Sequence, residues 1–135
     1  AKQVGPATDL SAQLVEYYPT TASWNSALQV VRSLNRLGAQ ENLDLMRLMA
    51  RTGTLNSRND YLSYIQDADA RRSPGETLKI MDQGVAAGKL SASDIADVRS
   101  LAQSRLSADR SSLPSYDAAA TDLVVERVLG MLARL

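Results

Sequence analysis

No cysteine, histidine or phenylalanine occurs in the 135-residue sequence, and tryptophan occurs once. Without cysteine the chain can form neither a disulfide nor a thiolate nucleophile. Because histidine is absent as well, zinc sites of the usual kind and nucleophile–histidine pairs are excluded. Acid–base chemistry would fall to carboxylates, lysines and tyrosines. We predict no catalytic residue, no metal site and no cofactor.

Net charge and long apolar runs are missing too. Fifteen Lys and Arg residues balance fifteen Asp and Glu residues, whereas nonspecific nucleic-acid binding needs a basic surface. No apolar run approaches the roughly 20 residues that span a bilayer. We therefore expect no nucleic-acid partner and no membrane insertion. The length suits one domain, and a start at Ala1 without a signal sequence suggests a processed chain or a fragment.

What the sequence does contain is an internal repeat. Residues 43–55, LDLMRLMARTGTL, return thirty-five positions later as residues 78–90, LKIMDQGVAAGKL. The two copies share a frame of Leu, Leu or Ile, Met, Ala or Val, Gly and Leu, and both end in Gly-x-Leu. Repetition at a period of about 20 to 50 residues is typical of stacked helical arrays.

A second pattern recurs at thirty-seven residues, with the i, i+3, i+4 spacing that places side chains on one helical face. Its members are Trp24, Ala27 and Leu28, then Tyr61, Tyr64 and Ile65, then Val98, Leu101 and Ala102. Each unit buries its apolar face only against a neighbour. We predict an all-α fold of antiparallel helical hairpins stacked as a short right-handed α-solenoid of six to seven helices. The expected parts are an N-terminal helix at 7–19 and repeat units at about 23–55, 60–90 and 93–135.

Capping and stop signals set the expected helix ends. The first helix should run from Ala7 to Tyr18 before Pro19, and the second to about Leu37, with Gly38 at its C-terminus. Asn42 should cap a third helix that ends at Gly53, and a fourth should span 58–71. Ser73-Pro74-Gly75-Glu76 has the form of a capping box for a fifth helix, and Ser91 to Asp94 opens a sixth. We expect a loop at 111–114 and a last helix at 116–135.

The bulky side chains within the repeat frame are expected in the core. Trp24 and the methionines could form a binding surface instead, but their helical spacing favours packing. Of Tyr17 and Tyr18, one ring should be buried and one exposed.

The paired helices resemble a degenerate tetratricopeptide-repeat array. Trp24 and Tyr61 match the early aromatic position of that family, and Gly84 matches its small crossing residue in the second helix. Residues 17–114 also resemble proteobacterial tetratricopeptide-like proteins of unassigned function, through Tyr18-Pro19 and Asp60-Tyr61 among others. The resemblance implies an exported, periplasmic helical repeat protein, with a cytoplasmic location as the alternative, and it implies no activity.

A non-enzymatic scaffold that binds a protein or peptide partner is the function that this resemblance implies. If the first helices of the pairs line the concave face, polar residues of mixed sign project from it and suit an extended peptide. They are Asn25, Gln29 and Arg32 from one unit and Asn59, Gln66 and Asp69 from the next.

Two alternatives remain open. The apolar C-terminal helix is a candidate for self-association, as a cap or in a homodimer, through Val124, Val128, Met131, Leu132 and Leu135. The remote alternative is an enzyme that uses carboxylates alone, with Asp67 and Asp69 or Asp94 and Asp97 as acid and base. Asp94 is better explained as helix first-turn charge, and Asp67 as an ion-pair partner of Arg71.

Overall fold

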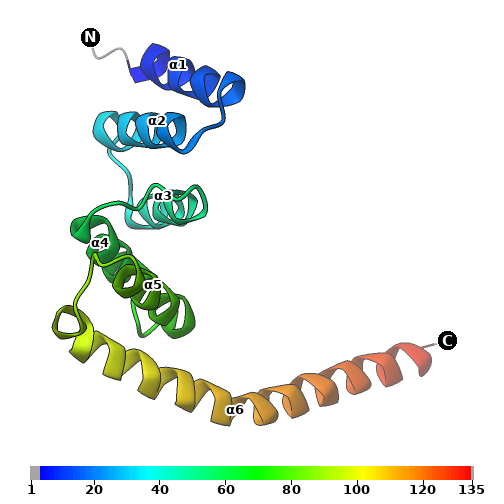
Figure 1. Cartoon of the computed structure of the whole chain (residues 1–135). Helices are drawn as coiled ribbons and strands as arrows, with labels where there is room; N and C mark the ends of the chain where they lie inside the picture. Colours follow the sequence, from blue (N-terminus) through cyan, green and yellow to red (C-terminus); the bar gives the residue numbers. More distant parts are fainter. Residues whose placement is uncertain (1–3, 135) are drawn as a thin grey trace.

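The computed structural model describes residues 4–134 as six α-helices, with no strand in that range. The all-α prediction is confirmed. The helices follow one another down the molecule, and the last runs beneath the others and extends well beyond them (Figure 1). They are α1 (Val4–Tyr17), α2 (Thr21–Leu34), α3 (Ala39–Arg51), α4 (Arg58–Ala68), α5 (Pro74–Ala86) and α6 (Ala92–Leu132).

Backbone contacts between the helices are sequential. Each helix packs on the next one in the chain, from α1 on α2 to α5 on α6, and no other pair within residues 4–134 comes as close. The core lies mainly where α3, α4 and α5 meet. Met46, Met49 and Met81 are fully buried there, which confirms their expected core role. Trp24 is half-buried and packs against the edge of this core.

The Gly-x-Leu ending of the sequence repeat has the same structure in both copies. Gly53 and Gly88 have positive φ angles of 69° and 66°, a conformation that costs glycine little because it has no Cβ. Leu55 and Leu90, two residues further on, are both buried in the core. The glycine therefore ends the helix and turns the chain so that the leucine packs against it.

Gly84 lies at a close approach between helices. A Cβ atom at this position would lie 2.6 Å from Cδ1 of Leu90 and 3.0 Å from Cδ1 of Tyr61. A Cβ contact of 2.6 Å essentially never occurs, so a larger residue here would force the Leu90 side chain, and to a smaller extent Tyr61, to shift.

Helix ends near α3 differ from the prediction. The second helix ends at Leu34, and Gly38 is the N-cap of α3 rather than the C-terminus of α2. Its N–H donates to Oε2 of Glu41 at 2.8 Å, so the N-cap of α3 lies four residues before the expected one. Asn42 lies inside α3, where its side chain donates to Asp67 of α4.

The end of α4 was also predicted wrongly. The helix stops at Ala68 because Asp69 adopts a positive φ of 52°, and Oδ1 of Asp69 accepts a hydrogen bond from the N–H of Arg71 at 3.0 Å. The expected ion pair between Asp67 and Arg71 does not form, because the helix that would place them one turn apart ends at Ala68. Asp67 accepts a hydrogen bond from Asn42 instead.

The largest correction concerns α6. The predicted loop at 111–114 is wrong, because one helix runs from Ala92 to Leu132 with Pro114 inside it. Proline has no N–H to donate and normally interrupts a helix. The hydroxyls of Ser111 and Ser112 donate to the carbonyl oxygen of Ala108 at 2.7 and 3.0 Å, so the serines that suggested a loop bond back to the helix.

The first helix runs from Val4 to Tyr17. It begins three residues before the predicted start at Ala7. Tyr17 and Tyr18 are 73% and 66% exposed. The prediction that one of these rings is buried is therefore wrong.

Candidate functional site

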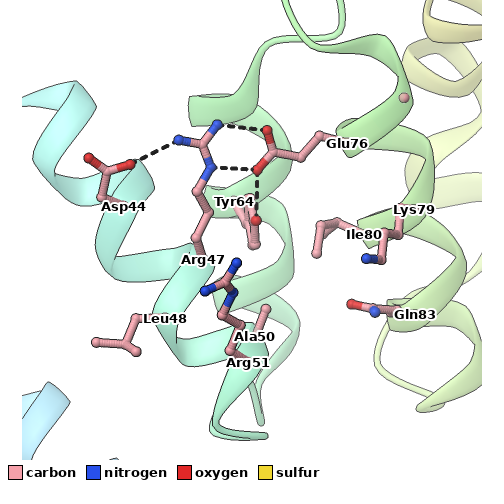
Figure 2. A pocket seen from close by; sticks show the side chains of 11 residues that line it. Asp44, Arg47, Leu48, Ala50, Arg51, Tyr64, Glu76, Lys79, Ile80 and Gln83 are labelled. Carbon is pink, nitrogen blue, oxygen red and sulfur yellow. Dashed lines mark hydrogen bonds and ion pairs between the residues drawn. The ribbon is translucent and has the colours of Figure 1, made fainter.

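A groove of about 840 Å³ lies between α3 and α5, with α4 beneath it, and we call it the α3–α5 groove (Figure 2). Its walls combine charged, amide and apolar side chains. Asp44, Arg47, Leu48, Ala50 and Arg51 come from α3, Tyr64 comes from α4, and Gly75, Glu76, Lys79, Ile80 and Gln83 come from α5.

One end of the groove is closed by a hydrogen-bonded network around Arg47. Its Nε and Nη2 atoms donate to Oε1 and Oε2 of Glu76, both at 2.8 Å. Its Nη1 donates to Oδ1 of Asp44 at 2.9 Å, and the Tyr64 hydroxyl donates to Oε1 of Glu76 at 2.8 Å. Figure 2 shows these four contacts converging from three helices. Two-point pairing of a guanidinium with a carboxylate fixes the orientation as well as the distance.

The pKa values of three groups in this network are shifted further from pH 7. Hydrogen bonds from Arg47 lower the pKa of Glu76, and the bonds to Glu76 and Asp44 raise the pKa of Arg47. Burial, and then the bond to Glu76, raises the pKa of Tyr64. At neutral pH Arg47 is therefore a cation, Glu76 an anion and Tyr64 a neutral phenol. A general acid or base works best with a pKa near the working pH, so these groups are suited to holding helices rather than to moving protons.

The rest of the groove has a surplus of positive charge. Both lining carboxylates, Asp44 and Glu76, are paired with Arg47. Arg51 and Lys79 are exposed on opposite walls (Figure 2), and neither makes an ion pair within residues 4–134. Apolar surface from Leu48, Ala50 and Ile80 lies among these polar groups. The groove thus offers two uncommitted cations above a partly apolar base.

Sequence reasoning missed this groove. It assigned Glu76 to a capping box with Ser73, but the Ser73 side chain makes no capping hydrogen bond and Glu76 turns to Arg47. Capping boxes do form at Ser57 with Asp60 and at Ser91 with Asp94. The available signal was the spacing of polar residues on these two helices, which places them on one face of each. Arg47 and Arg51 are four apart, and Glu76, Lys79 and Gln83 are three and four apart.

The six residues predicted for a concave face lie at several places. Gln29, Asn59 and Gln66 are exposed, and Asp69 ends α4. Asn25 is half-buried, and its Oδ1 atom is buried without a hydrogen-bond partner among the described residues. Nη1 of Arg32 pairs with Oδ1 of Asp60 at 2.8 Å.

Two of these six residues line the same pocket. Gln66 and Asp69 line a pocket of about 390 Å³ between α4 and α6, whose apolar part is formed by Leu62, Ile65, Ala70, Ile95, Val98 and Leu101. Their role in binding stays a prediction.

Three arginine–carboxylate bridges each connect a helix with the next but one. Arg32 of α2 pairs with Asp60 of α4, Arg47 of α3 with Glu76 of α5, and Arg58 of α4 with Asp94 of α6. Burial alone would raise the pKa of Asp60, but hydrogen bonds from Ser57 and Arg32 together lower it. Hydrogen bonds from Arg58 and then Ser91 lower the pKa of Asp94. The bridges therefore carry full charge at neutral pH.

The residues predicted for assembly are exposed. Val124, Val128, Met131 and Leu132 have 48% to 62% of their surface in solvent, while Leu135 lies outside the described residues. They belong to the part of α6 that extends beyond the other helices (Figure 1).

No protein-family model matches the sequence, and the comparisons found no similar curated protein and no similar solved structure. Among the described helices, none combines the length and apolar character needed to cross a bilayer. Residues 4–134 contain no group of three or more acidic side chains placed to hold a metal ion. The fold defines the class of this protein: it is all-α, and its helices pack on one another in chain order.

Proposed function

We propose that this chain is a non-enzymatic protein-binding module of tetratricopeptide type, in which the α3–α5 groove holds an extended acidic segment of a partner protein. The observation that carries the proposal is the pair of unpaired cations, Arg51 and Lys79, on opposite walls of a groove of about 840 Å³. A volume in this range suits a ligand of several residues, since binding pockets span about 300–1,000 Å³.

The lining of the groove favours a peptide with alternating character. Apolar side chains can pack on Leu48 and Ala50, which are half-buried, while carboxylates meet Arg51 and Lys79. The side-chain amide of Gln83 is exposed on the same wall as Lys79 and has donor and acceptor atoms for a peptide backbone. Because the Arg47–Glu76 bridge fixes the two walls against each other, the groove loses little conformational freedom when it binds.

The stacked-hairpin arrangement is part of the same proposal. It is supported by the identical Gly-x-Leu turns at Gly53 and Gly88 and by the three bridges between second-neighbour helices. Such arrays commonly act as scaffolds whose stacked helices present an extended surface. A location in the bacterial envelope rests on the family resemblance alone.

Fluorescence anisotropy with a labelled peptide of alternating leucine and glutamate tests the groove. We expect saturable binding that weakens as salt rises, and little binding of the matching leucine–lysine peptide. Replacing both Arg51 and Lys79 with glutamine should weaken binding about 10-fold or more, since each removed charge contact contributes roughly 1 kcal/mol.

Lys89→Gln is the matched control, because Lys89 is exposed and does not line the groove. Unchanged affinity in the double variant would exclude this groove. The same titration with Gln29→Ala and Gln66→Ala tests the surface predicted from sequence; loss of binding there, with none in the groove variant, would move the site to that face.

A further inference from the structure

The C-terminal half of α6 has no partner among the described residues. Its N-terminal half packs on α5 through Ile95 and Ala102, which are 2% and 0% exposed. Beyond Ala102 no residue of the helix is buried. From Leu113 to Leu132, nine large apolar side chains are 48% to 68% exposed.

Six of these side chains form one broad face. Val124, Val128 and Met131 make one row with spacings of four and three residues, and Val125, Leu129 and Leu132 make a second row beside it. Glu126, Gly130 and Ala133 fall on the opposite side of the helix. A helix with an apolar stripe this wide normally packs against another element.

The area of the face decides what can cover it. The six side chains of the two rows, at about half exposure, present on the order of 500 Å² of apolar surface. The largest apolar patch of a typical monomer is about 300–600 Å². Two copies that cover this face on each other would bury on the order of 1,000 Å² in total, which is the lower limit for a specific interface.

We propose that a second copy of this chain covers the face, with the two α6 helices antiparallel and centred on Val128. Symmetry about this residue sets Val124 of one copy opposite Leu132 of the other, so apolar rows meet apolar rows. Such an interface uses the same patch on both copies and closes on itself.

The helix dipoles favour the antiparallel direction over the parallel one. An antiparallel pair places the positive N-terminal end of one helix beside the negative C-terminal end of the other, whereas a parallel pair places like ends together.

Sedimentation equilibrium of the full chain tests the association. An interface of this size predicts a reversible dimer with a dissociation constant of about 1–100 µM. Val128→Glu places a charge at its centre and should raise this constant roughly 100-fold. Ala119→Glu is the control on the opposite side of the same helix and should leave it unchanged, with circular dichroism verifying that both variants fold. A chain that stays monomeric up to about 1 mM overturns the proposal.

Disulfide trapping tests the direction, because the chain contains no cysteine of its own. In the antiparallel pair, a mixture of the Val124→Cys and Leu132→Cys chains should cross-link as a heterodimer much faster than either chain cross-links with itself. Faster cross-linking of each variant with itself would show a parallel pair and overturn the arrangement.

Discussion

Arg47 of α3 and Glu76 of α5 are joined by two hydrogen bonds of 2.8 Å although twenty-nine residues separate them in sequence. Glu76 also accepts a bond from the Tyr64 hydroxyl of α4, so one carboxylate connects three helices. This contact sets the width of the α3–α5 groove and makes one end of it rigid. Groove shape and stability should therefore respond to the same substitutions.

Glu76→Gln should lower the free energy of unfolding by about 1–2 kcal/mol, because it removes a charge-assisted pair and weakens the Tyr64 bond. Solvent limits the loss, since the Arg47 side chain is 39% exposed. Urea unfolding measures the change. Asp44→Asn removes a more exposed partner of the same arginine and should cost less than about 0.5 kcal/mol. Equal effects of the two variants would contradict the central role of Glu76.

Gly84→Ala should destabilise the protein by about 1–3 kcal/mol, because the added methyl group would overlap Leu90 and crowd Tyr61. Alanine has the higher helix propensity, so any loss comes from packing. Gly75→Ala is the matched control in the same helix, where nothing lies within 4 Å of the new Cβ. Thermal or urea unfolding should show no loss there, and a stable Gly84 variant would contradict the close helix approach.

Pro114→Ala should increase the order of α6 around residues 110–118. The substitution supplies an N–H that can donate to the carbonyl oxygen of Arg110 and removes the clash of the proline ring with the preceding turn. Hydrogen exchange should show slower exchange of the neighbouring amides, and circular dichroism should show no loss of helix. Fast exchange throughout 111–114 in both proteins would favour the loop that the sequence suggests.

Acid should destabilise the protein through its bridges. The pKa values of Glu76, Asp60 and Asp94 are lowered in the folded state, so their contribution to stability is complete above the unfolded-state values of about 4. It is lost as the pH falls from there through the lower folded-state values, because the unfolded chain then binds protons more readily. Urea unfolding from pH 7 to pH 3 should show this decline.

Glu76→Gln should reduce the steepness of that decline, since one titrating group with a lowered pKa is gone. An identical pH dependence in the variant would show that Glu76 is not held ionised by the bridge. Tyr64 has the opposite effect at alkaline pH. Its pKa is raised in the folded state, so above about pH 10 the free energy of unfolding should fall as the pH rises and tyrosine ionises in the unfolded chain.

Local signals in the sequence predicted much of the fold. The Gly-x-Leu turns depend on backbone conformations that only glycine adopts easily, and the cap at Ser91 depends on Asp94, three positions away. Such features are visible in a short window. Pro114 was misread for the same reason, because a local rule for proline was applied where the helix continues on both sides.

Short sequence patterns could not predict the candidate site. Glu76 satisfies the pattern of a capping residue and also that of an ion-pair partner, and the sequence does not show that Arg47 lies within reach. The pairing depends on how α3 and α5 stack across α4, which is a tertiary relationship. The polar spacing of Arg47 with Arg51 was visible, but only the fold shows which helix it faces.

The three arginine–carboxylate bridges interlock, because each spans one helix and their spans overlap: α2 to α4, α3 to α5 and α4 to α6. Any cut between consecutive helices from α2 to α6 separates at least one arginine from its carboxylate. A version shortened at residue 90 would leave Arg58 without Asp94. Hairpins of this chain are therefore poor candidates for exchange or deletion as independent units, and engineering should move α2 to α6 together.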